Sequence, residues 1–584
     1  MKLKNYKSWH KKSEFENLLF FAQRSDELFF DYTLDTYKPA ALNPAFLCRE
    51  AIKLINDIEN DILDSTNLEY VIDELEWALN QDVVSKLMIN APVRKFILFG
   101  EGVKLSDTKT RLEVLERTLN PVGYIKVCQI ALKEEFYGGS KKRIESILKS
   151  YSSALTNIGI SKQHLYEKTQ QFFFYGNEIQ SIDDVDEFFH LVSPTVHNFE
   201  IYFIVSDLIS EVKDSISSFD LNILDELPES AKRHARENDI ELGDNEVWVE
   251  IDEVETYDRH AARKRAEARL DMVRDLFLLF SHKNRIHWRD EVIITQCCDE
   301  QPVVIRKPKN TMEKCFDLKT QDASKRLNAL IRNIGLKDQS FIKFHRAVDL
   351  HGISSTNELP ENQLLNIWIA LETLVPSHVH GGGKVVKVSN AIMPILLRNY
   401  LTRLIQRLAG DLVRWNRAKT SRLLRKLPDS RDMSLYQKVL ELTAFAQNQN
   451  LRDELYAELG EFYLLRYRLF ELSELFKKPG NLLKRIEIHE KKVAWQIRRI
   501  YRTRNLIVHS GRSIPYIDTL IENAHDYLDQ SMNNVIDYSC GILDAETIEQ
   551  TFDMAKLDYE VYLTELKSVE QFDRENIKFI ANLA

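Results

Sequence analysis

The residues most able to do chemistry gather in one short segment, Arg504 to His509, which reads Arg-Asn-Leu-Ile-Val-His. An imidazole titrates near neutral pH, so His509 can take or give a proton. Arginine and asparagine side chains donate hydrogen bonds to phosphate oxygens. The segment therefore combines a proton-transfer group with phosphate-binding groups, which is the mixture that metal-free cleavage of a phosphodiester requires.

RNA is the substrate that this mixture suits best, because the 2′-hydroxyl beside each phosphate is an internal nucleophile. A base removes its proton, cationic donors stabilise the pentacoordinate phosphorane, and an acid protonates the leaving 5′-oxygen. The expected products are a 2′,3′-cyclic phosphate and a 5′-hydroxyl. One histidine serves poorly as both acid and base, whereas two copies across a two-fold axis can divide the work. We therefore expect a homodimer or a higher homo-oligomer.

The segment lies on a predicted helix, because the chain from Ile486 to Val508 contains neither Pro nor Gly and stops near Gly511. At about 100° per residue, four polar side chains fall on one face. They are Arg498, Arg502, Asn505 and His509. Trp495 lies at the edge of that face, where it either stacks on a base or packs.

Arg504 does not fit this face, since it falls roughly 140° from His509 on a regular helix. Either the helix loosens before Gly511 and swings the histidine round, or Arg504 makes a structural or cross-dimer contact. We keep Arg504, Asn505 and His509 as catalytic candidates. Supporting or RNA-binding candidates are Arg498, Arg499, Arg502, Arg512 and Glu372.

The charge distribution favours a local nucleic-acid site. Of the 584 residues, which carry a net charge of −10, residues 381–520 hold 27 Lys and Arg against 13 Asp and Glu. This region therefore carries +14 and the remaining 444 residues carry −24. Phosphate contacts act locally, so a basic region in an acidic protein is compatible with RNA binding. Long solvated helices with arginine-rich faces would give the same counts.

We predict a mainly α protein in four parts, because helical periodicity dominates the chain. Strand-like runs occur at Val247 to Ile251 and Glu291 to Gln296. The expected parts are a helical N-terminal domain over 1–230, a small α/β connector over 231–315, a helical bundle over 316–540 and a helical extension over 541–584.

Two landmarks in this chain resemble the HEPN-domain ribonucleases. The first is the Arg504–His509 motif itself, an arginine and a polar residue followed by a histidine. The second is the helix Trp368–Leu374, which resembles the first core helix of Apea-like HEPN domains, with its apolar-Ala-Leu-Glu-x-Leu pattern. The resemblance covers roughly residues 320–540, with a longer spacer than a minimal HEPN bundle needs.

The resemblance implies a helical bundle that dimerises into a composite endoribonuclease site. It also implies a toxin or an anti-phage abortive-infection effector, cleaving RNA (tRNA is one candidate), with a phage-derived trigger or an antitoxin as partner. The N-terminal region would then sense a trigger or restrain the site. Some HEPN toxins carry a modifiable tyrosine two positions after the histidine. Gly511 stands there in this chain, which argues against that mode of control.

Glu372 has two interpretations. It either pairs with Arg502 or Arg504 and orients the guanidinium, or it is a solvated carboxylate on an otherwise apolar helix.

We expect no cofactor and no metal, since the six cysteines are scattered and the adjacent pair Cys297-Cys298 does not suit a shared zinc site. Few cysteines favour a reduced, cytoplasmic setting, and no stretch approaches the roughly 20 apolar residues that span a bilayer. The alternative function is a non-catalytic helical scaffold that binds RNA or a protein through the basic C-terminal region.

Overall fold

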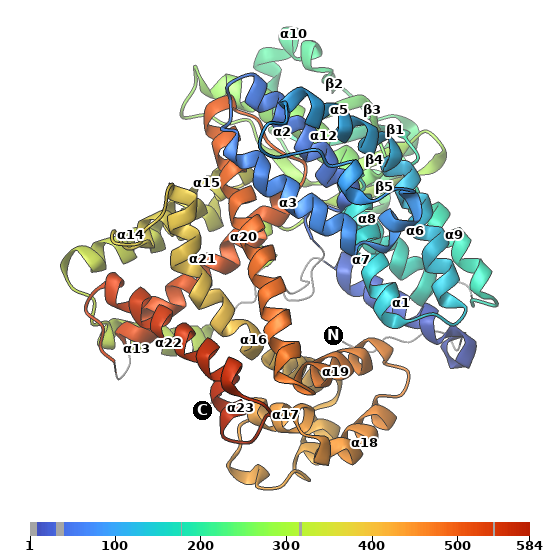
Figure 1. The fold of residues 1–584 in the computed structure, drawn as a ribbon. Coiled ribbons are helices and arrows are strands. Elements are labelled where there is room, and N and C mark those ends of the chain that lie inside the picture. The colour runs from blue at the N-terminus through green and yellow to red at the C-terminus, as the bar shows by residue number, and fades with distance from the viewer. Residues whose placement is uncertain (1–8, 31–39, 177, 315–317, 541–542, 584) are drawn as a thin grey trace.

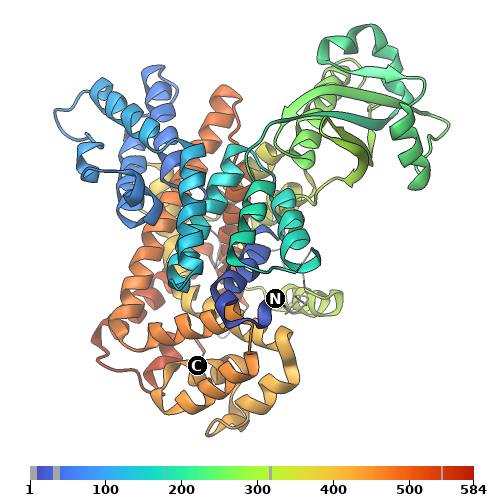
Figure 2. The same ribbon diagram turned by 90° about the vertical axis from the view of Figure 1, so that its right-hand side faces the viewer.

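The structure is a computed structural model that describes residues 9–30, 40–176, 178–314, 318–540 and 543–583. The prediction of a mainly α protein with one small sheet is confirmed (Figure 1). A lobe that contains the sheet stands apart from the helical body (Figure 2).

The N-terminal helices form one side of the helical body. Their bounds are α1 Glu16–Phe29, α2 Pro44–Glu59, α3 Thr66–Gln81, α4 Val83–Met88, α5 Leu105–Thr118, α6 Pro121–Phe136, α7 Lys141–Ile158, α8 Lys162–Gln170 and α9 Val185–Leu191. Local signals set where they begin: Asn43 caps α2 by accepting the Phe46 backbone N–H, and Pro44 follows at the first turn.

The sheet has five antiparallel strands in the order β2-β3-β1-β4-β5. The strands are β1 His197–Ser206, β2 Asn222–Leu224, β3 Glu246–Thr256, β4 Trp288–Gln296 and β5 Asp299–Arg306. Its helices are α10 Lys213–Ile216, α11 Glu229–Glu237 and α12 Arg259–Leu278. Apolar clusters fill both faces, one against α12 and one against α11.

The two predicted strand segments lie in β3 and β4, but the sheet starts earlier than the predicted boundary at 231. Its central strand β1 lies inside the region over 1–230 that was predicted to be a helical domain. Six consecutive residues of β1, from Ile201 to Ser206, are buried. A strand covered on both faces reads as a continuous apolar run rather than an alternating one, and a short run of that kind resembles a buried helix segment.

The C-terminal helices complete the body. Their bounds are α13 Thr320–Asn333, α14 Asp338–Thr356, α15 Pro360–Leu374, α16 Lys384–Leu424, α17 Leu435–Ala444, α18 Gln449–Leu459, α19 Tyr463–Phe476, α20 Pro479–Ser510, α21 Ile517–Ser539, α22 Ile548–Ser568 and α23 Asn576–Ile580. One apolar core joins them to the N-terminal helices. The described part of the predicted extension over 541–584, residues 543–583, belongs to this core, because α22 packs against α16 and buries Phe552 and Tyr562.

Candidate functional site

The candidate site lies on α20, which is a single regular helix. It begins with Pro479 in its first turn and ends at Gly511, which adopts a left-handed conformation with φ 62°. Glycine takes up that conformation without steric cost, so it is a natural stop. The helix does not loosen before Gly511, which removes one of the two explanations offered for Arg504.

The side chain of Arg504 is linked to the helix face that carries His509 by a hydrogen bond to Asn505. The Arg504 Nη1 donates to Asn505 Oδ1 at 3.1 Å, and both residues are partly exposed. Asn505 lies one helical turn before His509, so the two share a face. His509 is exposed in the last turn and makes no hydrogen bond or ion pair with another described residue. The hydrogen bond thus turns the Arg504 guanidinium toward the face that carries the imidazole.

The arginines in the middle of α20 are buried instead of facing a ligand. Arg499 is 2% exposed and Arg502 5%. Glu50 on α2 accepts from Arg499 Nη2 at 2.9 Å and also binds Arg502 Nη2, while Glu74 on α3 accepts from Arg499 at 2.6 Å. Arg499 and Arg502, expected to support the site or to bind RNA, therefore have their guanidinium groups occupied by two carboxylates in this structure.

This buried network is strongly charged. Burial alone would raise the pKa of Glu50, but the positive charges of Arg499 and Arg502 outweigh it and lower the pKa to about 2. Tyr516 adds a hydrogen bond from its hydroxyl to Glu50 at 2.9 Å. Glu50 is therefore ionised at neutral pH and holds α2 against α20.

Other predicted residues of α20 also contact the N-terminal helices. The Arg498 guanidinium lies 3.5 Å from the centre of the Tyr70 ring. Trp495 is buried against Trp77 and donates to Asp73 at 2.9 Å, so it packs rather than offering a platform for a base.

Beyond the helix end, Arg512 Nη2 donates to Asp57 on α2 at 2.6 Å, while its side chain stays 40% exposed. Its Nε also donates to Ser510 Oγ at 3.1 Å.

Glu372 forms neither of the expected ion pairs. Arg502 is bound by Glu50, and Arg504 makes its described hydrogen bond to Asn505. Glu372 is partly buried, and its Oε1 has no hydrogen-bond partner among the described residues. Trp368 on the same helix packs its ring 5.3 Å from that of Tyr501, which brings α15 against α20.

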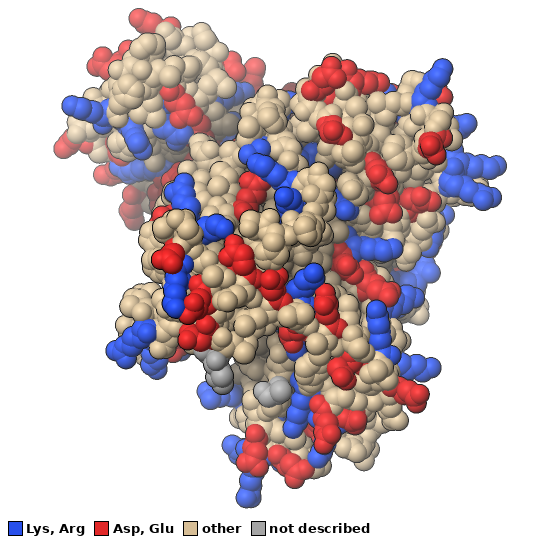
Figure 3. All heavy atoms as spheres, turned by 60° about the vertical axis from the view of Figure 1, so that its left-hand side comes forward, with Lys and Arg blue, Asp and Glu red and all other residues tan. Residues whose placement is uncertain are grey.

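Sequence reasoning missed the acidic residues of α2 and α3 that bind α20 and the residue Arg512 just beyond it, which are Asp57, Asp73, Glu50 and Glu74. The sequence did hold one signal for these pairs. The net charge of residues 381–520 is positive, whereas that of the rest of the chain is negative, so ion pairs between the two were to be expected. On the face shown in Figure 3, basic and acidic side chains are interspersed.

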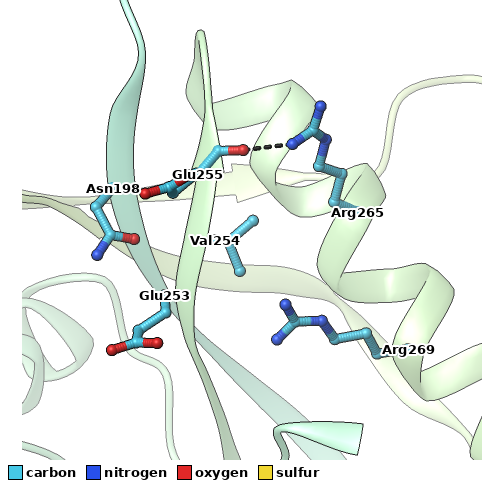
Figure 4. Close-up of a pocket in the computed structure, with 6 residues that line it drawn as sticks. All are labelled: Asn198, Glu253, Val254, Glu255, Arg265 and Arg269. Carbon is cyan, nitrogen blue, oxygen red and sulfur yellow. Dashed lines mark hydrogen bonds between the residues drawn. The ribbon is translucent and has the colours of Figure 1, made fainter.

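The sheet lobe carries a pocket between β1, β3 and α12, lined by Asn198, Glu253, Val254, Glu255, Arg265 and Arg269 (Figure 4). Both of its arginines bind carbonyl oxygens of β3: Arg265 binds that of Glu255, and Arg269 binds that of Asp252 at 3.4 Å. These bonds hold α12 against the strand, and two glutamates share the lining. The pocket is therefore poorly suited to a phosphate.

Two groups of side chains have the composition of metal ligands, although the sequence led us to expect no metal. Where β1 begins and β4 ends, His197 Nδ1 lies 3.2 Å from Cys298 Sγ, with Cys297 beside them. In the C-terminal helices His351, His525 and Asp529 converge. Neither group contains a residue of the Arg504–His509 segment.

No described helix combines the length and the apolar character needed to cross a membrane. No family model matches this sequence, and neither a curated protein nor a solved structure shows significant similarity to it.

Proposed function

We propose that this chain is a metal-independent endoribonuclease of the HEPN type whose site is the C-terminal end of α20. The observation that carries the proposal is the group at the end of α20, in which His509 is exposed, Arg504 and Asn505 are partly exposed, and the Arg504–Asn505 hydrogen bond directs a guanidinium toward the histidine face. His509 transfers the proton, Arg504 stabilises charge on the phosphorane, and Asn505 orients Arg504.

A single His509 cannot readily act as base and acid in one turnover, so the proposal requires at least a dimer. A second copy of the α20 end, across a two-fold axis, supplies the other histidine. Exposure of His509 and Val508 at this end leaves room for that partner.

The N-terminal helices act as a restraint in this proposal. Their carboxylates bind Arg499 and Arg502 in the way that RNA phosphates would. A cytoplasmic toxin or abortive-infection effector, released by a phage-derived trigger or held by an antitoxin, is consistent with such internal restraint.

The test is RNA cleavage by purified full-length protein in EDTA. His509→Ala should lower the cleavage rate by about 10²- to 10⁴-fold, the usual contribution of general acid–base catalysis. The products of the wild type should end in 2′,3′-cyclic phosphate and 5′-hydroxyl.

His190→Ala is a matched control, because His190 is also exposed in the last turn of its helix, α9. It should cleave at the wild-type rate. Cleavage by His509→Ala at the rate of the control, in protein of equal circular dichroism, would refute the assignment of His509.

A second candidate function, a non-catalytic RNA-binding scaffold, is favoured by a basic hollow on α16. It is lined by Arg417, Ala418, Ser421, Arg422 and Arg425. Arg422 is paired with Glu458, whereas Arg417 and Arg425 are exposed and form no ion pair with a described residue. RNA binding that is lost in Arg417→Ala/Arg425→Ala, together with no cleavage by the wild type, would support the scaffold instead.

A further inference from the structure

Two imidazole rings from different helices meet inside the C-terminal bundle. His351 on α14 and His525 on α21 place their Nε2 atoms 2.8 Å apart, with ring centres 5.0 Å apart. These residues are 174 positions apart in the chain. Helix α15 packs against both α14 and α21, and so fixes the two helices relative to each other.

A carboxylate completes the group. Asp529 follows His525 by one helical turn, a spacing that puts both side chains on one face. Its Oδ1 lies 3.5 Å from His525 Nε2 and 3.7 Å from His351 Nε2. Two imidazole nitrogens and one carboxylate oxygen thus form a small triangle.

The edges of this triangle match a metal coordination sphere. Imidazole and carboxylate ligands lie about 2.0–2.2 Å from a zinc ion, and a tetrahedral arrangement therefore sets neighbouring ligand atoms about 3.3–3.6 Å apart. The two distances to the carboxylate, 3.5 and 3.7 Å, fit this range closely, and the two imidazole nitrogens, 2.8 Å apart, would separate by about half an ångström to admit the ion. Small side-chain rotations would suffice to admit the ion.

The three side chains of the triangle differ in their exposure to solvent. The side chain of His525 is 8% exposed and that of His351 is 30% exposed, so both imidazoles are largely shielded from solvent. Asp529 is 42% exposed, which opens one side of the triangle to solvent. Arg403 on α16 binds the neighbouring Asp526 through two hydrogen bonds of 2.6 and 2.8 Å and so ties this part of α21 to α16.

We propose that His351, His525 and Asp529 bind a divalent transition-metal ion of the Zn²⁺ class, with the remaining coordination positions taken by water. Two histidines and one carboxylate are a ligand set that proteins use for zinc and other first-row metals. The ion ties α14 to α21 within the bundle. This inference stands independently of the proposed ribonuclease activity.

The test is calorimetric titration of ZnCl₂ into chelator-treated full-length protein. The protein carries Cys297→Ser and Cys298→Ser throughout, because these cysteines and His197 form a second possible zinc-binding group. We expect one ion per chain and a rise in the melting temperature. His525→Ala should weaken binding by more than about 100-fold, since even outer-shell changes cost about 10- to 100-fold.

His345→Ala is the matched control. His345 is exposed on the same helix α14 and also has a carboxylate one turn later, Asp349, at 3.4 Å. It should bind zinc as the unaltered protein does. Because His525 is buried, Asp529→Asn and His351→Ala repeat the test at more exposed positions.

Co²⁺ provides a spectroscopic check, since four-coordinate Co²⁺ absorbs visible light far more strongly than the octahedral aqua ion, and this absorption should vanish in His351→Ala. Equal zinc affinity in the three ligand variants and the His345→Ala control would overturn the proposal. So would a titration with no zinc bound. In either case the two imidazoles would share a proton and nothing more.

Discussion

The middle and the C-terminal end of the basic stretch on α20 carry similar side chains in opposite surroundings. In the middle, Arg499 and Arg502 are buried and bound by carboxylates of α2 and α3. At the end, His509 is exposed and Arg504 is partly exposed, with no carboxylate partner among the described residues. Arginine content alone therefore does not mark a nucleic-acid site, because partner and burial decide what each guanidinium can still bind.

Removing a buried arginine should have the largest effect. Arg499→Met leaves Glu50 and Glu74 with too little positive charge, and breaking a buried ion pair costs about 3–5 kcal/mol. Chemical denaturation of the full chain measures this loss. Lys491→Met, at an exposed position of the same helix, should change stability by less than about 0.5 kcal/mol. If the two substitutions changed stability equally, the buried arginine would contribute no more than an exposed lysine, and the contrast between the two surroundings would be refuted.

Acid should weaken the same network. Because the pKa of Glu50 is about 2 in the folded protein against an ordinary value of 4.5, its contribution is full above about pH 4.5 and is lost as pH falls through about 2. The stability difference between wild type and Glu50→Gln should therefore shrink by about 2 kcal/mol between pH 6 and pH 3. Glu76→Gln, at an exposed position of α3, should show no such change. If the stability difference between wild type and Glu50→Gln did not change with pH, the ionised Glu50 would not be stabilised by the arginines as described.

Arg498 should show the smallest effect, since it is only partly buried and contacts a ring rather than a carboxylate. A double-mutant cycle between Arg498→Ala and Tyr70→Leu should give a coupling of about 0.5–1 kcal/mol, the usual size of a partly exposed cation–π contact. Zero coupling would place Arg498 with the surface arginines that remain open to RNA.

Local rules predicted α20 and its end well, because the absence of Pro and Gly and the stop at Gly511 are properties of adjacent residues. The same geometry correctly gave one face to Asn505 and His509. Helix geometry alone could not predict which parts of the molecule pack against that face and which parts leave it open to solvent. Arg499 pairs with a residue 449 positions away, and periodicity carries no information about such a contact.

The metal-ligand triangle was invisible for a related reason. His525 and Asp529 have a spacing common on solvated helices, and only the packing of α14 and α21 brings His351 to them. In the sheet, β1 escaped prediction because burial on both faces removes the alternation that marks a strand.

The order of synthesis gives the pairing of α20 with α2 and α3 a further consequence. Glu50 and Glu74 precede Arg499 by 449 and 425 positions, so at about 5–20 residues per second their helices leave the ribosome about 20–90 s before α20 does. Helices α2 and α3, which carry the two glutamates, have therefore left the ribosome before the arginines of α20 emerge from it. A nascent chain never presents its basic helix to the surrounding ribosomal RNA without a competing intramolecular partner.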